Sequence, residues 1–296
     1  MADSIARPVD RVIGGYLILA GLALAPPHTT PVGLLLLLVH LSVGTALLAG
    51  KLDPIHQFAA HATAPGTSRR RRWTGLLIDW YPLVVMPCLY LELPILNTAA
   101  WGGHYFDLMV QGWEETVFGG QPSVTMARRW PSPWVSEPLH LAYLSYFAIL
   151  YVYPAVVYIR RGREAFHQTV FAMLLAFTIH YTVFVYFPVK GPYFVFPAPG
   201  EPVSDGLFYA GVHFVLGHGA SAGTAFPSSH VALSAVQTGN ALRQMPASAP
   251  ILALATLGIA VGAVYAGVHY AVDTGLGLVT GTVLALLAPA ARRWLS

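Results

Sequence analysis

Long apolar segments separated by short polar ones run along the whole chain. At a rise of 1.5 Å per residue, about 20 apolar residues are needed to cross the hydrocarbon layer of a membrane. Eight segments approach this length, and they predict an all-α, polytopic membrane bundle of about eight transmembrane helices. The predicted spans lie near residues 12–26, 31–50, 74–93, 137–159, 166–187, 229–243, 250–268 and 274–291.

The composition agrees with this pattern. Of the 296 residues, 55% are hydrophobic and 10% are charged, whereas soluble domains carry about 25% charged residues. A soluble protein is therefore excluded. Cys88 is the single cysteine, so no internal disulfide forms, and no Cys/His spacing is typical of a metal site. We expect no metal and no other cofactor.

The basic residues predict the orientation of the spans. If the N-terminus is cytoplasmic, the segments on the cytoplasmic side hold all but three of the 16 Lys and Arg residues. This distribution follows the positive-inside rule and predicts an integral membrane protein with both termini in the cytoplasm. The net charge of +3 then reports topology, so no nucleic-acid partner is expected. The three exceptions are Arg128, Arg129 and Lys190.

Two features near the cytoplasmic side have simple interpretations. The segment before Pro26 resembles a secretory signal, but a proline after the cleavage position argues against cleavage, so we interpret it as a retained helix. The run Arg69 to Arg72 is typical of a topology anchor that contacts anionic lipids.

The chain is expected to form one membrane domain, residues 1–296, with two helices added before a six-helix core. The outer segment 94–136 holds a predicted interfacial helix, because Phe106, Met109, Val110, Trp113 and Val117 recur at helical spacing. Gly119, Gly120 and Pro122 are expected to end that helix.

Three polar clusters interrupt the spans, and the predicted topology places all three on the outer face. They are Pro188–Pro192 with Lys190, Pro227–His230 with Ser228 and Ser229, and Tyr265–Asp273 with His269. Ionisable groups at membrane depth are costly, and function is their usual explanation. The sequence therefore predicts a functional site on the non-cytoplasmic face.

The residue types in these clusters suit a phosphate. His269 and Asp273 are four residues apart, which predicts a shared helical face and an imidazole oriented by a carboxylate. His230 is expected at a helix N-terminus, where backbone N–H groups favour anions. Taken alone, each cluster has a structural alternative: an ion pair, a serine N-cap at Ser228, or an interface anchor at Lys190.

The order of the clusters resembles the type 2 phosphatidic acid phosphatase (PAP2) superfamily of membrane phosphatases and phosphotransferases. Its three outer motifs are Lys-x6-Arg-Pro, Pro-Ser-Gly-His and Ser-Arg-x5-His-x3-Asp. Lys190 looks like the lysine of the first motif, and Pro227–His230 matches the second with Ser229 in place of glycine. His269 and Asp273 match the third. The resemblance covers about residues 166–291.

Two departures from the family motifs narrow the resemblance. The arginine and proline of the first motif would fall at Pro197 and Ala198, and the Ser-Arg of the third at Gly262 and Ala263. Because the family's arginines hold phosphate, their absence argues against an ordinary small-phosphate phosphatase. A branch with His-Tyr-x-x-Asp and no preceding arginine is similar to inositol phosphorylceramide synthase and to the sphingomyelin synthases. The stretches AFPSSH and YAGVHYAVDTGLG look closest to that synthase branch.

The resemblance implies a mechanism and its residues. His269 is the implied nucleophile, Asp273 orients it, and His230 is the acid and base. The implied phosphate ligands are Lys190, Ser228 and Ser229, and Tyr193 is a candidate replacement for a missing arginine. A membrane phospholipid is the expected donor, and water or a lipid hydroxyl is the acceptor.

Five other ionisable residues lie in or beside the apolar spans. Either they line a head-group pocket or they make interhelical hydrogen bonds. They are Asp79, Glu92, Glu137, His140 and His180.

Three activities remain open from the sequence. The first is phospholipid phosphotransfer, and the second is hydrolysis of phosphatidic acid or a polyprenyl diphosphate. The third is lipid transport by a protein that keeps the fold without catalysis. A vanadate haloperoxidase-like site ranks last, because those enzymes are soluble and use the missing arginines.

Overall fold

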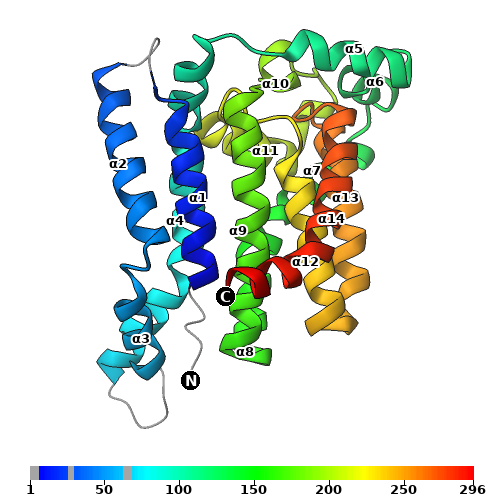
Figure 1. Cartoon of the computed structure of the whole chain (residues 1–296). Coiled ribbons are helices and arrows are strands. Elements are labelled where there is room, and N and C mark those ends of the chain that lie inside the picture. Colours follow the sequence, from blue (N-terminus) through cyan, green and yellow to red (C-terminus); the bar gives the residue numbers. More distant parts are fainter. Residues whose placement is uncertain (1–6, 26–29, 63–68) are drawn as a thin grey trace.

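The computed structural model describes residues 7–25, 30–62 and 69–296, and most of them are helical (Figure 1). Pro26, on which the argument against a cleaved signal rests, lies outside these residues. The first half comprises α1 (Arg7–Leu22), α2 (Pro31–Leu48), α3 (Asp53–Ala62), α4 (Arg69–Trp101), α5 (Asp107–Phe118), α6 (Pro122–Arg129) and α7 (Pro133–Phe147). A π-helical turn, Ala148–Val152, joins α7 to α8 (Tyr153–Arg161). There follow α9 (Arg163–Tyr186), α10 (Pro192–Val195), α11 (Leu207–Gly219), α12 (Ser229–Gln244), α13 (Ala249–Tyr265) and α14 (Ala271–Leu295).

The all-α membrane bundle predicted from the sequence is confirmed. Each of the eight predicted spans coincides with a helix, and in the described part of the chain six segments are long and apolar enough to cross a membrane. The other two, α1 and α12, have 16 residues each, so a count of eight is not confirmed. The six are Pro31–Leu48, Trp73–Trp101, Pro133–Arg161, Arg163–Tyr186, Pro246–Tyr265 and Ala271–Leu295.

Helix α9 forms the centre of the bundle. In its apolar window 72% of the residues are buried, against 39% or less in the other five candidate spans. It packs against α1, α4, α12 and α14, and Phe166, Met173 and Phe184 are fully buried on it. The central helix therefore holds the N-terminal helices against the C-terminal ones.

Helices α12 and α14 approach each other closely because glycines line their contact. A Cβ atom at Gly277 would lie 2.5 Å from the carbonyl oxygen of Ser228, and one at Gly281 would lie 2.3 Å from that of Ala232. Small residues allow such close packing of helices in membranes. The N-termini of the two helices are thereby held side by side.

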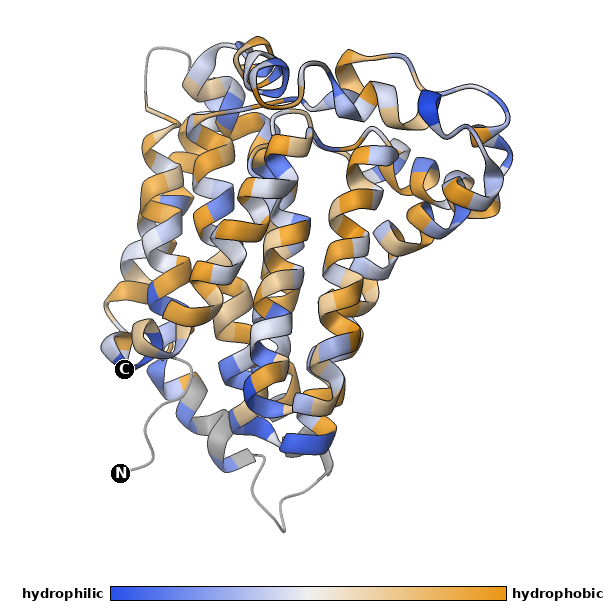
Figure 2. Ribbon diagram, turned by 90° about the vertical axis from the view of Figure 1, so that its right-hand side faces the viewer, coloured by the Kyte–Doolittle hydropathy of each residue, from blue (hydrophilic) through white to orange (hydrophobic). Residues whose placement is uncertain are grey.

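The two ends of the bundle carry different elements. Arg11 donates a hydrogen bond to the carbonyl of Leu295, so the start of α1 lies beside the end of α14, at the opposite end from α5 and α6 (Figure 1). Figure 2 shows hydrophobic residues along the helices and hydrophilic residues concentrated toward the ends of the bundle. This arrangement is that of an integral membrane protein.

The predicted interfacial helix is α5. It ends at Gly119, which has a φ of 68° and closes the helix in a left-handed conformation. Leu108 and Val117 are exposed, whereas Asp107, Val110 and Glu114 are buried against the rest of the protein. The buried face of this helix is therefore largely acidic.

The sequence analysis placed no helix between residues 188 and 228, yet α11 lies there and packs on α7. Glu137 of α7 fixes its start, because its carboxylate accepts hydrogen bonds from the amides of Phe208 and Tyr209 at 3.0 and 3.1 Å. A carboxylate at a helix N-terminus stabilises the helix through its unpaired N–H groups and its dipole.

Candidate active site

The three polar clusters meet at the end of the bundle that carries α5 and α6. Val189 and Thr224 form an isolated parallel bridge, and the amide of Ala225 donates to the carbonyl of Val189 at 3.0 Å. The amide of Ser228 donates to the carbonyl of Asp273 at 3.0 Å. Backbone hydrogen bonds therefore join the first cluster to the segment that leads into the second, and the second cluster to the third.

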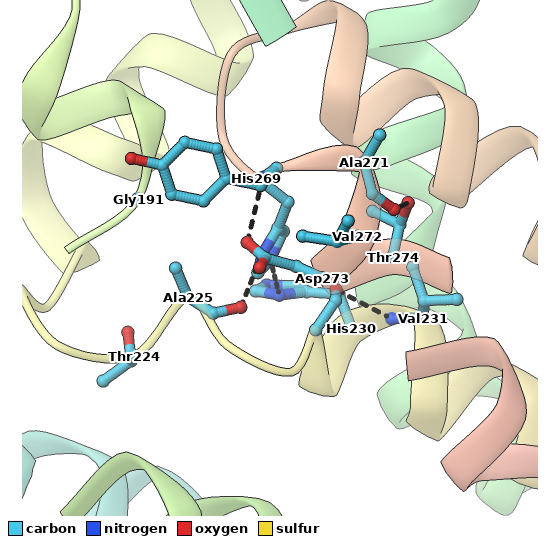
Figure 3. Close-up of polar contacts among 12 residues, drawn as sticks. Gly191, Thr224, Ala225, His230, Val231, His269, Ala271, Val272, Asp273 and Thr274 are labelled. Carbon is cyan, nitrogen blue, oxygen red and sulfur yellow. Dashed lines mark hydrogen bonds and ion pairs between the residues drawn. The ribbon is translucent and has the colours of Figure 1, made fainter. Parts of the chain in front are cut away.

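The two histidines of the clusters contact each other. Nε2 of His269 lies 3.3 Å from Nδ1 of His230, and Nδ1 of His269 lies 2.9 Å from the carbonyl oxygen of Ala225 (Figure 3). Nε2 of His230 lies 3.4 Å from the hydroxyl of Tyr143 on α7. Tyr143 carries no signal in the sequence that distinguishes it from other membrane tyrosines.

These contacts define one consistent hydrogen-bond chain. Because a carbonyl only accepts, Nδ1 of His269 carries the proton and its Nε2 is an acceptor. His230 then donates through Nδ1 and accepts from Tyr143 through Nε2. Burial lowers the pKa of His269 to about 4, so its imidazole is neutral at neutral pH. The nitrogen with the free electron pair is the one that faces His230.

Asp273 approaches His269 in a different way from the one predicted. The shared helical face is wrong, because His269 precedes α14 and only Asp273 lies on it. Oδ2 of Asp273 accepts from the amide of Tyr270 at 2.9 Å and lies 3.6 Å from Nδ1 of His269. The carboxylate is thus a cap of α14 that lies beside the imidazole, while the carbonyl of Ala225 makes the closer contact.

The serines of the second cluster have separate positions. Ser228 is the N-cap of α12, fully buried, and its hydroxyl accepts from the amide of Val231 at 3.4 Å. Ser229 lines the cavity beside His230 and His269. Only Ser229 therefore presents a side chain to that space.

The cavity in front of the histidines has a volume of about 290 Å³. Its polar end holds Lys190, Tyr193, Ser229, His230 and His269. Most of the remaining lining is aromatic or aliphatic. This apolar part includes Tyr90, Tyr146, Leu150, Phe177, Tyr181 and Leu216.

Lys190 is the cation of the cavity. Its ammonium group lies 4.6 Å from the centre of the Tyr105 ring, a cation–π contact. The loop that carries it is fixed by Asp107 of α5, whose carboxylate accepts from the amides of Lys190 and Gly191 at 2.9 and 3.0 Å. The hydroxyl of Tyr270 also donates to Asp107, at 3.1 Å.

A second carboxylate of α5 holds the third cluster. Oε1 of Glu114 accepts from the amide of Val272 at 2.8 Å, at the N-terminus of α14. Burial raises the pKa of Glu114 to about 7. The sequence analysis missed both α5 carboxylates as site residues, although their spacing of seven places them on one helical face and was the available signal.

The five candidate pocket residues lie elsewhere. None of them lines the cavity of His269, and each has contacts of its own elsewhere in the structure. Asp79 pairs with Arg163 at 2.6 Å, Glu92 with His40 at 3.1 Å, and His180 contacts Thr280 at 3.1 Å. Nδ1 of His140 donates to the carbonyl of Ser136 at 2.7 Å, and Glu137 caps α11. The alternative interpretation, interhelical hydrogen bonds, describes Asp79, Glu92 and His180. Glu137 caps α11, and His140 bonds within α7.

The structure gives a steric reason for the missing third-motif arginine. A Cβ atom at Gly262 would lie 2.3 Å from the carbonyl oxygen of Leu139, and Ala263 is fully buried where α13 packs on α7. Pro197 and Ala198, at the positions of the first-motif arginine and proline, line a second cavity. Among the described residues no group of three or more His, Cys, Asp or Glu side chains is arranged to hold a metal ion.

A comparison with protein families matches residues 115–291 to the PAP2 superfamily. The match covers more than half of the 296 residues and begins within α5, well before the region on which the motifs depend. No curated protein and no solved structure matches the chain. Helices α1 to α4 precede the matched region.

Proposed function

Since the chain belongs to the PAP2 superfamily, we propose that it moves a phosphoryl head group between membrane lipids through a covalent bond to His269. The observation that carries this proposal is the orientation of that imidazole. Its Nδ1 proton is held by the carbonyl of Ala225, so the electron pair of Nε2 faces His230 and the cavity.

The proposed reaction has two steps. Nε2 of His269 attacks phosphorus, and the bond between phosphorus and the leaving lipid oxygen breaks. His230 is neutral in the resting chain, takes up a proton when the anionic phosphate binds, and gives that proton to the leaving oxygen. A hydroxyl of the acceptor then attacks phosphorus and returns a proton to His230. The P–N bond breaks, and its electron pair returns to Nε2.

The phosphate must separate the two imidazoles, which are 3.3 Å apart in the resting arrangement. Lys190, Ser229 and Tyr193 line the same polar end and are the proposed ligands of its oxygens. The N-terminus of α12, which begins at Ser229, favours an anion at this end of the cavity. Ser228, the N-cap of α12, holds this helix end in place.

The apolar walls favour a lipid over a soluble phosphate. Two tails or an isoprenoid chain suit the tyrosine-rich part of the cavity, with phosphorus at His269. The absent arginines favour the inositol phosphorylceramide synthase branch, in which the acceptor is a lipid hydroxyl. Hydrolysis, with water as the acceptor, uses the same residues and is the alternative.

We also propose that the chain is one membrane domain with the site on the non-cytoplasmic face. The support is the distribution of basic residues: Arg160 and Arg161 end α8, and Arg292 and Arg293 lie in the last turn of α14. The ends of α8 and α14 lie toward the end of the bundle away from α5 and α6 (Figure 1). Cysteine labelling from outside intact cells, at Ser132→Cys and Ser296→Cys, tests this orientation.

The function is tested with purified protein in detergent. Phosphatidylinositol is offered with a fluorescent ceramide or diacylglycerol, and phosphatidic acid and a polyprenyl diphosphate are offered separately. Lipid products and free phosphate are followed. His269→Ala is the test variant and His218→Ala the control, because His218 is exposed on α11.

A new phosphorylated acceptor lipid, lost in His269→Ala and kept in His218→Ala, supports the synthase. Release of free phosphate without transfer to a lipid supports hydrolysis and contradicts the assignment to the inositol phosphorylceramide synthase branch. Turnover that survives His269→Ala contradicts the covalent scheme. No turnover with any of these lipids would favour the non-catalytic transporter.

A further inference from the structure

A second cavity of about 490 Å³ lies next to the first at the same end of the bundle. It is formed by α6, by the segment 196–203 and by the loop before His269. Ligand pockets in proteins measure about 300–1,000 Å³, so its size suits a small organic group. Neither the proposed chemistry nor the tail-binding walls use this space.

Two residues of the cavity lining have buried polar atoms with no hydrogen-bond partner within the described part of the chain. Ser123 on α6 is 7% exposed, and its buried Oγ makes no hydrogen bond to those residues. Nε2 of His213 on α11 is likewise buried and unpaired. Buried polar atoms nearly always have partners in native proteins, so two such atoms on one cavity indicate a polar ligand.

The charges around the cavity balance. Arg128 contributes one cation and Glu201 one carboxylate. Burial lowers the pKa of His213, which keeps that imidazole neutral at neutral pH. The cavity therefore offers donors and acceptors without a net charge.

The chemistry of the lining distinguishes among head groups. Hydroxyl groups both donate and accept, and they match serine, imidazole, guanidinium and carboxylate together. A quaternary ammonium would leave Arg128 and Ser123 without an acceptor. A bare phosphate would meet the carboxylate of Glu201 and would fill little of the volume.

The two cavities are neighbours. Tyr193 lines both of them. The loop before α14 separates them, because Ala266 and Gly267 line the outer cavity while Val268 and His269 line the inner one. The outer cavity therefore lies behind the loop that carries His269, and Tyr193 borders both spaces.

We propose that the outer cavity binds the uncharged, hydroxyl-rich head group of the lipid whose phosphorus reacts at His269. The assignment rests on the proposed function. The head group stays in the outer cavity on the phosphorylated histidine, while one lipid alcohol leaves the apolar cavity and the next enters. Retention of the head group during this exchange favours transfer to a lipid over loss to water.

Binding of a soluble head group tests this assignment without turnover. Radiolabelled glycerophosphoinositol is equilibrated by dialysis with the full-length protein in detergent, in the wild-type and His269→Ala forms. Unlabelled glycerophosphoinositol, glycerophosphocholine and glycerol phosphate compete. Glu201→Gln and Arg128→Gln remove polar partners, and Arg129→Gln is the matched control because Arg129 is the adjacent residue and does not line the cavity.

A blocking variant provides a second measurement. Gly200 lines the outer cavity, and a Cβ atom there would meet nothing within 4 Å, so Gly200→Trp fills the space without a clash at the backbone. Gly120→Trp is its control, since Gly120 has the same open surroundings and does not line the cavity.

We expect saturable binding in both the wild type and His269→Ala. The Kd should rise about tenfold or more in Glu201→Gln, Arg128→Gln and Gly200→Trp, the effect of losing a hydrogen bond to a charged group. Both controls should bind as the wild type does. Equal competition by glycerol phosphate, preferred binding of glycerophosphocholine, or equal weakening in the controls overturns the assignment.

The outcome is separable from that of the proposed function. Binding that persists in a protein without turnover contradicts the reaction and leaves the cavity assignment standing. Lipid transfer by a protein that binds no glycerophosphoinositol contradicts the cavity assignment alone.

Discussion

Nε2 of His269 lies 3.3 Å from Nδ1 of His230, although 39 residues separate them in the chain. One histidine precedes α14 and the other lies in the first turn of α12, so the contact depends on how those two helices pack. The resting site is therefore closed by a hydrogen bond between its two reactive side chains. A substrate phosphate has to replace that bond with its own contacts.

This arrangement predicts a dependence on the leaving group. His230→Ala should reduce turnover of a lipid alkoxide donor by about 10²–10⁴-fold, the usual contribution of a general acid. A nitrophenolate leaving group needs little protonation, so turnover of a donor that carries it should fall much less. Initial rates with the two donors, measured side by side, check this.

Tyr143→Phe is the milder companion variant. It removes the hydroxyl that lies 3.4 Å from Nε2 of His230 and keeps the ring in place. We expect turnover to fall less than in His230→Ala. As in that variant, turnover of the lipid alkoxide donor should fall more than turnover of the nitrophenolate donor. Equal losses with both donors in His230→Ala would show that His230 does not protonate the leaving group.

The spans and the motif order could be predicted from the sequence because both are local. Apolar runs of membrane length define the helices, and the spacing of His269 and Asp273 is conspicuous in an apolar chain. The family match across residues 115–291 confirms the resemblance to the PAP2 superfamily, and it does not extend to the synthase branch. The individual roles of the site residues stay predictions.

The contacts that orient the site could not be read in the same way. The partner of Nδ1 of His269 is the backbone carbonyl of Ala225, and a carbonyl has no signature in a sequence. Asp79 and Glu92 illustrate the opposite error. A charge in an apolar span suggests function, but these carboxylates pair with Arg163 and His40 on neighbouring helices.

Asp107 of α5 is predicted to position Lys190. Its carboxylate accepts from the amides of Lys190 and Gly191 and from the hydroxyl of Tyr270. In Asp107→Asn the amide NH₂ group faces one of these donors, which costs about 1–3 kcal/mol. We expect kcat, measured at a temperature well below the Tm of the variant, to fall about tenfold. Glu115→Gln, exposed on the same helix, should retain wild-type kcat.

Glu114 gives the stability of the protein a predictable pH dependence. Its pKa is raised to about 7 from an ordinary value of 4.5, mainly by burial. The folded state therefore binds more protons than the unfolded state between these values. The stability from the protonated group is complete below pH 4.5 and is lost as pH rises through about 7.

Glu114→Gln removes this titration and keeps an acceptor for the amide of Val272. The variant and the wild type should have similar Tm at pH 4.5, and the variant should be more stable by pH 7.5. A gain of about 2–4 °C corresponds to about 1 kcal/mol in a chain of this size. His269 titrates in both proteins, so it cancels in the difference. A difference in Tm that is constant across this range would contradict the raised pKa.

The glycine contact between α12 and α14 is predicted to support both histidines. A Cβ atom at Gly277 would lie 2.5 Å from the carbonyl oxygen of Ser228, the N-cap of α12, so Gly277→Ala must push the two helices apart. Overpacking of this kind costs about 1–3 kcal/mol. Because the displaced cap directly precedes Ser229 and His230, activity should fall further than the change in Tm alone explains.

Gly275→Ala on the same helix is the control. A Cβ atom there meets nothing within 4 Å, and alanine favours a helix over glycine, so its Tm and activity should equal or exceed those of the wild type. Thermal unfolding and turnover of the two variants decide the point, and identical behaviour would mean that the close approach of α12 and α14 does not hold the site together.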